Sequence, residues 1–485
     1  MIFDFNEASS RISNVKYDVC VCGTGPAGIT TARKLALRGK KVLLVEGGGL
    51  EYSDQSQDIY DGKNVGRLYW GIQAFRLRYF GGTSNHWSGR CGVLDAIDFE
   101  PREYFGLPGW PISREQVMHG LAEAQDIVDI GGKDLSPFDD PEFQTSLFRQ
   151  SGFALSPPTR FSKKYDAEIR RSDKIDFFYN ANLVDLRLTD DLSRVRGLLV
   201  KNYNGDIVEV SAKRFVLALG AIETARILLN ANSQMAAGVG NNSGMVGRCF
   251  MEHLNVPIGR FIVTAPEFWQ NAVALVPTTE FMVKNNIGNG ILSFGPNANP
   301  VSYGRLRVLK QFLRETGCTL PALVEIARKV VSFDCPGDGL ITSLIEQTPN
   351  PDSRVGLSNE LDKLGLRRVQ LNWQINDRDK RTIRVLAIEA AKEMARLNRA
   401  RIKLAPFIID PNLEMEVDVH AHQMGTTRMS NDPRYGVVNE NCQVHGVENL
   451  YLIGSSVFST GGGTNPTLTI VLLAIRLAEF LGSQT

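Results

Sequence analysis

Three glycines near the amino terminus have the spacing that is typical of loops that bind the phosphates of a dinucleotide. Gly23, Gly25 and Gly28 follow a short apolar stretch and precede a helix-forming one. The first two let the backbone turn tightly and approach a pyrophosphate, and the third lets a helix pack closely on a strand. Glu46 ends the next apolar stretch, where its carboxylate would accept the ribose hydroxyls. This fingerprint predicts a dinucleotide site and serves NAD and FAD equally.

Two polar residues near the carboxyl terminus have side chains suited to chemistry on a hydroxyl group. His422 begins the segment His-Gln-Met-Gly-Thr, and Asn465 begins Asn-Pro-Thr. A neutral imidazole, with a pKa of about 6.5, can take a proton near pH 7. An uncharged carboxamide can hold an oxygen by a hydrogen bond. Pro466 suits the first turn of a helix, whose free amides, with the hydroxyl of Thr467, would face a ligand.

The order of these motifs resembles that of the glucose–methanol–choline (GMC) oxidoreductases, a family of FAD enzymes. The resemblance covers both ends of the chain and the segment Gly81–Gly89, and it is nearest to the pyranose oxidase and sugar dehydrogenase branch. It implies oxidation of an alcohol to a carbonyl, with His422 as the base, Asn465 as the orienting partner and flavin N5 as the hydride acceptor. It favours a sugar, glycoside or polyol, with a non-sugar alcohol as the alternative.

The second glycine-rich segment resembles the part of the family that runs along the flavin. It supplies Gly81, Gly82, Thr83, Ser84 and His86 as expected cofactor contacts. In pyranose oxidase a histidine at the place of His86 is bonded covalently to the flavin methyl group, and several related dehydrogenases carry a histidine there without a proven bond. The resemblance therefore implies contact between His86 and FAD and leaves a covalent bond open.

Further expectations come from the same resemblance. Backbone contacts to the cofactor are expected at Gly47, Val184, Gly220 and Gly454. The glycines 461–463 are expected to leave room for the flavin ring. Apart from the resemblance, Gln347 is expected to bind substrate because it follows a predicted strand and precedes Thr348-Pro349-Asn350. His253 and His420 are expected to be structural. No spacing of cysteine, histidine or acidic residues is typical of a metal site.

The helices and strands that the sequence predicts around these residues indicate an α/β plus β fold. We expect a Rossmann-type FAD-binding domain built from discontinuous segments, and a substrate domain whose antiparallel sheet covers the flavin. The FAD-binding domain is expected to take residues 1–110, 171–253 and 420–485, and the substrate domain residues 111–170 and 254–419. Helices are expected over 113–128, 377–397 and 468–481.

The composition of the chain excludes several classes of partner and of protein. The chain of 485 residues has 54 basic and 53 acidic side chains, which argues against nucleic acid as the main partner. Seven irregularly spaced cysteines argue against a disulfide framework. No apolar run reaches the roughly 20 residues of a membrane span, and no signal peptide opens the chain, so a cytoplasmic location is expected. Export with a partner subunit is the alternative, and the oligomeric state stays open.

The expected partners are a small alcohol or sugar and an electron acceptor, either oxygen or another compound. Three other functions compete with this interpretation. A flavin-holding lyase resembling the hydroxynitrile lyases would need no redox step. A catalytically silent flavoprotein would not need the histidine and asparagine pair. A dehydrogenase that uses NAD would share the glycine motif but would not be yellow.

Overall fold

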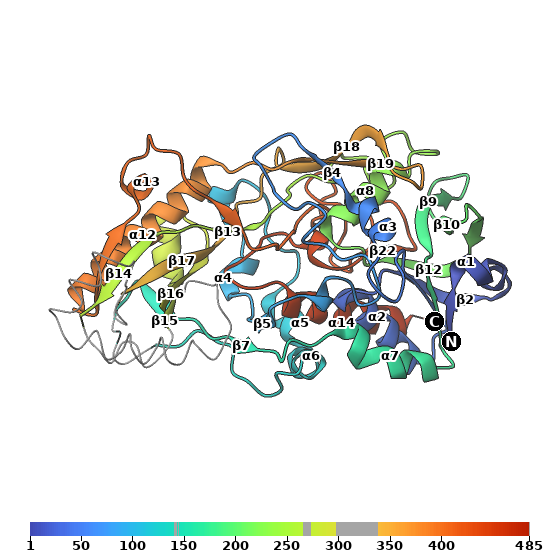
Figure 1. Cartoon of the computed structure of the whole chain (residues 1–485), viewed down its shortest axis with the longest axis horizontal. Coiled ribbons are helices and arrows are strands. Elements are labelled where there is room, and N and C mark those ends of the chain that lie inside the picture. The colour runs from blue at the N-terminus through green and yellow to red at the C-terminus, as the bar shows by residue number, and fades with distance from the viewer. Residues whose placement is uncertain (140–142, 144, 265–272, 297–337, 485) are drawn as a thin grey trace, which may run out of the picture.

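The computed structural model describes residues 1–139, 143, 145–264, 273–296 and 338–484. At the amino-terminal end of the molecule lies a six-stranded sheet in which neighbouring strands are parallel (Figure 1). Its order is β1 (Ile2–Asp4), β8 (Ile175–Tyr179), β3 (Val42–Val45), β2 (Tyr17–Cys22), β12 (Ala212–Leu217) and β22 (Leu450–Leu452). Strands from three distant parts of the chain therefore build one sheet, as the discontinuous domain requires.

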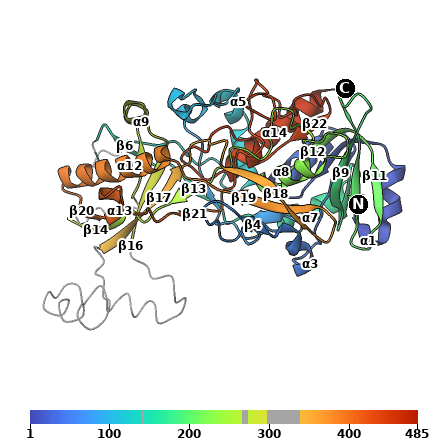
Figure 2. The same ribbon diagram turned by 90° about the horizontal axis from the view of Figure 1, so that it is seen from above.

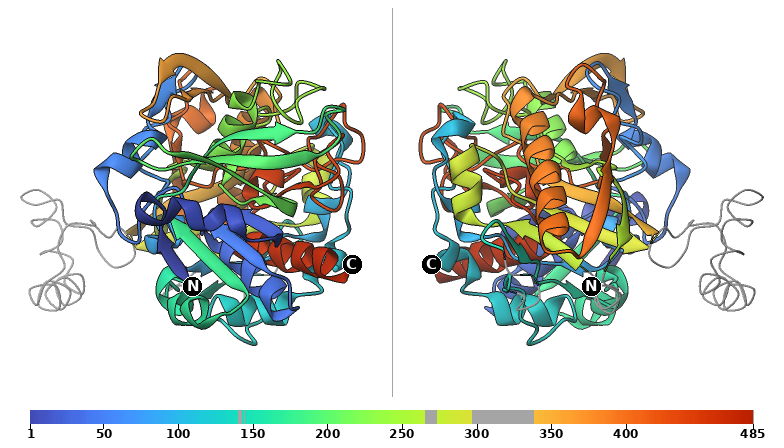
Figure 3. Two further views of the ribbon diagram at one scale, coloured as in Figure 1. Left: turned by 90° about the vertical axis from the view of Figure 1, so that its right-hand side faces the viewer. Right: turned by 90° about the vertical axis from the view of Figure 1, so that its left-hand side faces the viewer.

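Helix α2 (Pro26–Leu37) packs on this sheet and contacts β2, β3 and β8. Three further helices lie at the same end of the molecule, namely α7 (Phe161–Arg171), α8 (Ala221–Asn230) and α14 (Thr467–Ser483). The apolar face of α14 packs on α2, so the last helix of the chain lies beside the first long one (Figure 3). The helix expected over 113–128 is two short helices, α5 (Arg114–Met118) and α6 (Leu121–Ile127), which meet at Gly120. A Cβ at Gly120 would lie 2.9 Å from Ile475, so this break lets the pair pack closely on α14.

The second large layer is an eight-stranded antiparallel sheet at the other end of the molecule (Figure 2). Its strands are β20 (Ala400–Leu404), β14 (Gly259–Val263), β17 (Asp338–Glu346), β16 (Gly290–Pro296), β15 (Val273–Pro277), β6 (Phe148–Gln150), β13 (His253–Asn255) and β21 (Asp418–Val419). The long helix α12 (Asp377–Arg396) lies across it and contacts β17 and β20 (Figure 3). Its Asn376 capping box explains the sharp start.

Smaller elements connect and cover the two layers. The hairpin signal at Asn204-Gly205 is confirmed by β10 (Val195–Lys201) and β11 (Ile207–Val210), which pair with β9 (Asn182–Leu188). Further short strands are β4 (Gly62–Asn64), β5 (Arg90–Cys91), β7 (Ala154–Leu155), β18 (Arg354–Leu361) and β19 (Arg367–Asn372). Further short helices are α1 (Phe5–Ala8), α3 (Asp54–Gln57), α4 (Ala96–Phe99), α9 (Thr279–Asn285) and α13 (Pro406–Ile409).

Elements of two expected segments pack in different places. Among the described residues of 111–170, β6 joins the antiparallel sheet, whereas α5 and α6 pack on α14 and α7 packs on α2. The guanidinium of Arg33 on α2 fixes α7 through two hydrogen bonds to Glu168. Within 254–419, the hairpin of β18 and β19 packs on α8 beside the parallel sheet. Both placements depend on tertiary contacts that local sequence pattern does not carry.

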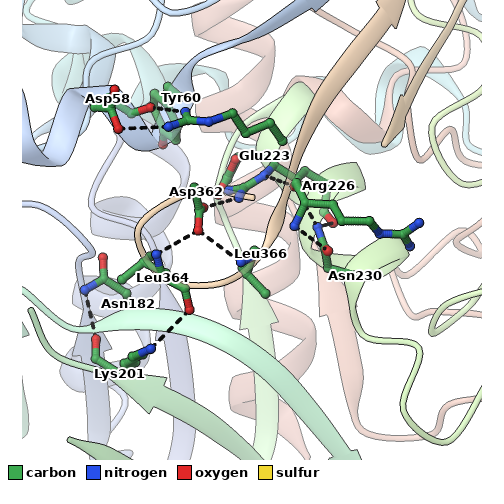
Figure 4. Close-up of polar contacts among 12 residues, drawn as sticks. Asp58, Tyr60, Asn182, Lys201, Glu223, Arg226, Asn230, Asp362, Leu364 and Leu366 are labelled. Atoms are coloured by element: carbon green, nitrogen blue, oxygen red, sulfur yellow. Dashed lines mark hydrogen bonds and ion pairs between the residues drawn. The ribbon is translucent and has the colours of Figure 1, made fainter. Parts of the chain in front are cut away.

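A buried ion-pair cluster fastens that hairpin (Figure 4). The guanidinium of Arg226 on α8 donates to both Glu223 and Asp362, and all three side chains are buried. Asp362 also accepts the amide hydrogens of Leu364 and Leu366, which closes the hairpin turn. Glu223 is therefore a structural partner of Arg226 in the first turns of α8.

No described helix is long and apolar enough to cross a membrane.

Candidate active site

A cavity of about 460 Å³ lies along the carboxyl ends of β2, β12 and β22. Such ends, at the point where strand order reverses, are where open parallel sheets bind ligands. The walls come from residues 23–27, 82–84, 86–88, Arg90, 218–221, 420–423, 453–455, 465–467 and Ile470, with Glu46, Tyr60 and 75–77. The cavity therefore joins the glycine motif near the amino terminus to His422 and Asn465 near the carboxyl terminus.

The loop of residues 23–28 is fixed by close packing at Gly28 and by hydrogen bonds to Glu46. A Cβ at Gly28 would lie 1.9 Å from the carbonyl oxygen of Gly23, so only glycine lets α2 approach the loop this closely. Glu46 accepts hydrogen bonds from the amide and the hydroxyl of Thr24, at 3.0 and 2.6 Å. Its other oxygen accepts the amide hydrogen of Gly48 at 3.1 Å. The carboxylate thus braces the loop while it lines the cavity.

The cavity walls offer open space and groups that favour an anionic ligand. A Cβ at Gly25, Gly220 or Gly454 would meet nothing within 4 Å, so these glycines leave open space in the wall for a ligand. The helices α2, α8 and α14 begin there, and helix amino termini favour anions. Arg76 adds a buried guanidinium whose Nη1 lies 3.9 Å from a carboxylate oxygen of Glu223 and has no hydrogen-bond partner among the described residues. A dinucleotide with an anionic pyrophosphate meets these requirements.

The cavity wall gathers most of the predicted cofactor residues. They are Gly23, Gly25, Glu46, Gly82, Thr83, Ser84, His86, Gly220, Gly454, Pro466 and Thr467. Gly28 and Gly81 lie just behind the wall, where a Cβ would collide with Gly23 and Ser162 respectively. Gly47 packs against the Arg78 guanidinium, which a Cβ would meet at 2.2 Å. Val184 lies in a separate apolar cluster with Ile59 and Leu364. The structure does not bring Gly47 or Val184 to this wall.

The structure does not place Gln347 where it could bind substrate. The side chain is fully buried, and its Oε1 accepts hydrogen bonds from the Glu252 amide and the Trp373 indole, both at 3.0 Å. Its Nε2 donates to the carbonyl of Gln374 at 2.6 Å. The amide is therefore occupied in holding β17 against neighbouring segments. The sequence position after a strand gave no sign of this, because burial depends on the segments packed around it.

His422 and Asn465 meet at the wall of the cavity. The Nδ2 of Asn465 lies 3.2 Å from the Nε2 of His422, although 43 positions separate the two residues. The Oδ1 of Asn465 is buried without a hydrogen-bond partner among the described residues. An unpaired buried polar atom is costly, so this oxygen marks a place where a ligand completes the site.

Two further histidines surround His422. The Nδ1 of His253 lies 2.9 Å from the Nδ1 of His422, and the ring of His420 stacks on that of His422 with centroids 5.7 Å apart. Burial, reinforced by the two neighbouring rings, lowers the pKa of His422 well below its usual value. Burial also lowers the pKa of His420, and it lowers that of His253 to about 4. All three rings are therefore neutral at pH 7.

A buried glutamate aligns the backbone of the histidine pair. One oxygen of Glu252 accepts the amide hydrogens of His422 at 2.6 Å and His253 at 2.9 Å. The other oxygen accepts the hydroxyl hydrogen of Tyr69 at 2.8 Å, and Tyr69 in turn accepts from Gln423 at 2.7 Å. Burial raises the pKa of Glu252 to about 7. The carboxylate fixes both chain segments relative to each other.

Sequence reasoning missed several of these contacts. His253 was expected to be structural, yet it contacts the ring of His422 directly. His420, also expected to be structural, lines the cavity while its Nε2 bonds the Ser343 carbonyl at 2.8 Å. Arg90 was not singled out; it lines the cavity, and its Nη2 is buried without a partner among the described residues. The motif Glu252-His253 beside a predicted strand was the available signal.

The glycines 461–463 do not line this cavity. A Cβ at Gly462 would lie 2.3 Å from Leu94, and one at Gly463 would lie 2.7 Å from Asn289. A Cβ at Gly461 would lie 3.1 Å from Met424 and 3.5 Å from the His253 ring. These glycines therefore make room for buried side chains behind His422 and Asn465, and the structure does not place them in the wall of this cavity.

The chain thus combines a parallel-sheet layer that carries a glycine-rich dinucleotide motif with a second, antiparallel-sheet layer. Residues 349–474 match a family model described as GMC oxidoreductase. This match agrees with the resemblance to the GMC oxidoreductases that the motifs gave, and the cofactor of that family is FAD.

Related proteins agree with this assignment. A 2-methyl-1,2-propanediol dehydrogenase from Mycolicibacterium austroafricanum is 25% identical over 96% of this chain and 95% of its own length. A C-glycoside 3-oxidase from Microbacterium trichothecenolyticum is 32% identical over 27% of this chain and 24% of its own. A solved structure of pyridoxine 4-oxidase from Mesorbium loti superposes with a TM-score of 0.59 and 16% identity, covering 96% of this chain and 99% of that chain. The last likeness supports the fold.

Proposed function

We propose that this protein oxidises the hydroxyl group of a small molecule to a carbonyl, with FAD as the hydride acceptor. The observation that carries the proposal is the pair His422 and Asn465, whose side chains meet at 3.2 Å in the wall of the dinucleotide cavity. A proton acceptor and a neutral hydrogen-bond donor at one point are what a reacting alcohol requires.

The chain's own residues supply the proton chemistry. The alcohol hydrogen takes the place of the Asn465 amide at the Nε2 of His422, and a hydrogen on Nδ2 of Asn465 bonds the alcohol oxygen. His422 accepts the hydroxyl proton as the carbon–hydrogen bond weakens, and Asn465 holds the oxygen at a fixed distance. The lowered pKa keeps His422 unprotonated and ready to act at pH 7. The bound FAD supplies the site that accepts the hydride.

We further propose a sugar, glycoside or polyol as the substrate. The resemblance to the sugar-oxidising branch supports this class, and so do the names of a diol dehydrogenase and a C-glycoside oxidase among the related proteins. The cavity carries polar groups beyond the catalytic pair, including Gln423, His420 and Ser88, which suit a ligand with several hydroxyls. The electron acceptor, the cytoplasmic location, the oligomeric state and the domain boundaries stay predictions.

A substrate panel tests this function. Purified holoenzyme is incubated with sugars, glycosides, polyols and simple alcohols, in turn with oxygen and with an artificial electron acceptor. We expect a carbonyl product from at least one polyhydroxylated compound, in a one-to-one ratio with reduced acceptor. Conversion of a substrate with no reduction of any acceptor would contradict the proposal and favour a lyase. Faster turnover of monohydric alcohols than of every polyhydroxylated compound would contradict the substrate class.

We also propose that His86 forms the covalent link to FAD that the family resemblance left open. The ring of His86 lines the cavity, and burial together with the Arg160 charge lowers its pKa. It therefore presents a neutral nitrogen to the ligand. After acid precipitation the yellow colour should stay with the wild-type protein and should leave the His86→Ala variant. Colour that passes entirely into the wild-type supernatant would rule the bond out.

A further inference from the structure

The ring of His253 is fully buried, and both of its nitrogens have a partner. The Nδ1 atom lies 2.9 Å from the Nδ1 of His422, and the Nε2 atom lies 2.9 Å from the carbonyl oxygen of Gly462. The two rings meet edge to face, with centroids 5.1 Å apart and an interplanar angle of 87°. Direct contact between two imidazole nitrogens requires that one carries a hydrogen and the other does not.

The Gly462 carbonyl decides which nitrogen carries the hydrogen. A carbonyl oxygen only accepts, so the Nε2 of His253 must be the donor. Because burial lowers the pKa of His253 to about 4, the ring is neutral at pH 7 and its Nδ1 carries no hydrogen. His422 must then donate from its own Nδ1. A neutral His422 that donates from Nδ1 has an unprotonated Nε2, which is the atom that faces Asn465.

The same hydrogen-bond pattern fixes the amide of Asn465. With an unprotonated Nε2 on His422, the Nδ2 of Asn465 donates to it and the Oδ1 is left without a partner in the described residues. The reverse orientation would require a hydrogen on Nε2 of His422. The Nδ1 of His253 would then need a hydrogen as well, which would make His253 a buried cation.

We propose that His253 is a positioning residue that holds His422 in the one neutral tautomer able to act as the base. The proposal rests on the function proposed above and deepens it. His253 would orient the catalytic histidine as a carboxylate does in other enzymes, but with a neutral ring. After His422 accepts a substrate proton on Nε2, the hydrogen on Nδ1 still donates to His253, so the hydrogen bond strengthens as charge forms.

The carbonyl that orients His253 is itself rigidly held. The Gly462 amide donates to Glu346 at 3.0 Å, and both oxygens of Glu346 bond the guanidinium of Arg102 at 2.7 Å. Glu346 and Arg102 are buried, and Leu94 leaves no room for a side chain at Gly462. A buried ion pair therefore fixes the peptide, the peptide fixes the His253 ring, and the ring fixes the tautomer of His422.

Two substitutions separate this role from simple packing. His253→Asn keeps an acceptor oxygen at the position of Nδ1 and loses the donor to Gly462. His253→Gln keeps a donor near the position of Nε2 and loses the acceptor that faces His422. Both side chains are polar, uncharged and smaller than the ring. A packing role would affect the two variants alike, whereas the proposed role predicts activity only in the first.

The rate at which saturating substrate reduces the bound FAD without oxygen is the first measurement. We expect His253→Asn to keep this rate within about threefold and His253→Gln to lower it by on the order of 100-fold, because a wrong tautomer removes the base. The substrate concentration at half-maximal rate should stay nearly unchanged, since His253 does not touch the substrate. Equal rates in the two variants, or a slower His253→Asn, would overturn the proposal.

The wild-type holoenzyme provides a second measurement that needs no turnover. The chain has six histidines, so labelling them with ¹⁵N gives a spectrum simple enough to assign by comparison with His422→Ala. We expect His422 to show a protonated Nδ1 and an unprotonated Nε2 at pH 7, with His253 protonated on Nε2. A protonated Nε2 on His422 would overturn the tautomer assignment even if the enzyme oxidises alcohols. The expected spectrum in a protein that oxidises no alcohol would leave the assignment standing and refute the proposed function alone.

Discussion

Replacing His422 with alanine should lower the rate of FAD reduction by substrate by about 10²- to 10⁴-fold, the usual contribution of a positioned general base. This corresponds to about 3–5 kcal/mol of lost transition-state stabilisation. The effect should be large because the neighbouring rings of His253 and His420 cannot replace it. The Nε2 of His253 is bonded to the Gly462 carbonyl and that of His420 to the Ser343 carbonyl. Rapid mixing without oxygen measures this rate directly.

The His422→Ala variant should still bind FAD, because the glycine loop and the helix amino termini that contact the cofactor remain. Its visible absorbance per protein should therefore equal that of the wild type. His119→Ala is the matched control, since His119 is an exposed residue on the short helices that cover α14. A His422→Ala enzyme that reduces its flavin as fast as the His119→Ala enzyme would refute the assigned base.

Replacing Gly28 with alanine should weaken FAD binding by about 5- to 150-fold, the equivalent of an overpacking cost of about 1–3 kcal/mol. A Cβ at this position would lie 1.9 Å from the Gly23 carbonyl oxygen, and neither backbone segment can move aside without shifting the loop. The start of α2 would be pushed away from the cavity, and its amides would no longer point at the pyrophosphate. The ratio of flavin to protein absorbance after purification measures the loss.

Gly356→Ala is a suitable control for the glycine substitution. Its Cβ would meet only the Gln370 carbonyl oxygen at an ordinary 3.7 Å, and it lies in β18 away from the cavity. This variant should retain wild-type flavin content and a nearly unchanged thermal midpoint. A Gly28→Ala protein with full flavin content would show that the loop does not need close packing of α2, contrary to the role assigned to the third glycine.

Much of the fold was predictable because its signals are local. The strand β2 and the helix α2 follow from an apolar run and the glycine motif, and α12 and α14 begin within one residue of their expected starts. Where prediction was wrong, the cause was tertiary. Gly120 divides the expected helix over 113–128 because Ile475 leaves no room for a side chain there. The hairpin of β18 and β19 lies on α8 because Arg226 and Asp362 form a buried ion pair.

In the candidate site, too, some residues were predictable from local sequence and others were not. His422 and Asn465 were predictable because each lies in a recognisable motif, and the structure brings the two together. The contact between His253 and His422 spans 169 positions, and no local pattern encodes which two rings will meet. Gln347 shows the opposite error. Its position after a strand was interpreted as a ligand contact, but its side chain makes three buried hydrogen bonds within the protein.

The most direct test of the central claim is to mix the oxidised holoenzyme with its best polyhydroxylated substrate in the absence of oxygen. If the protein oxidises an alcohol with FAD as the acceptor, the yellow absorbance should disappear in a single turnover, one carbonyl product should form per flavin, and oxygen or another acceptor should restore the colour. Substrate conversion with an unchanged flavin spectrum would contradict the account.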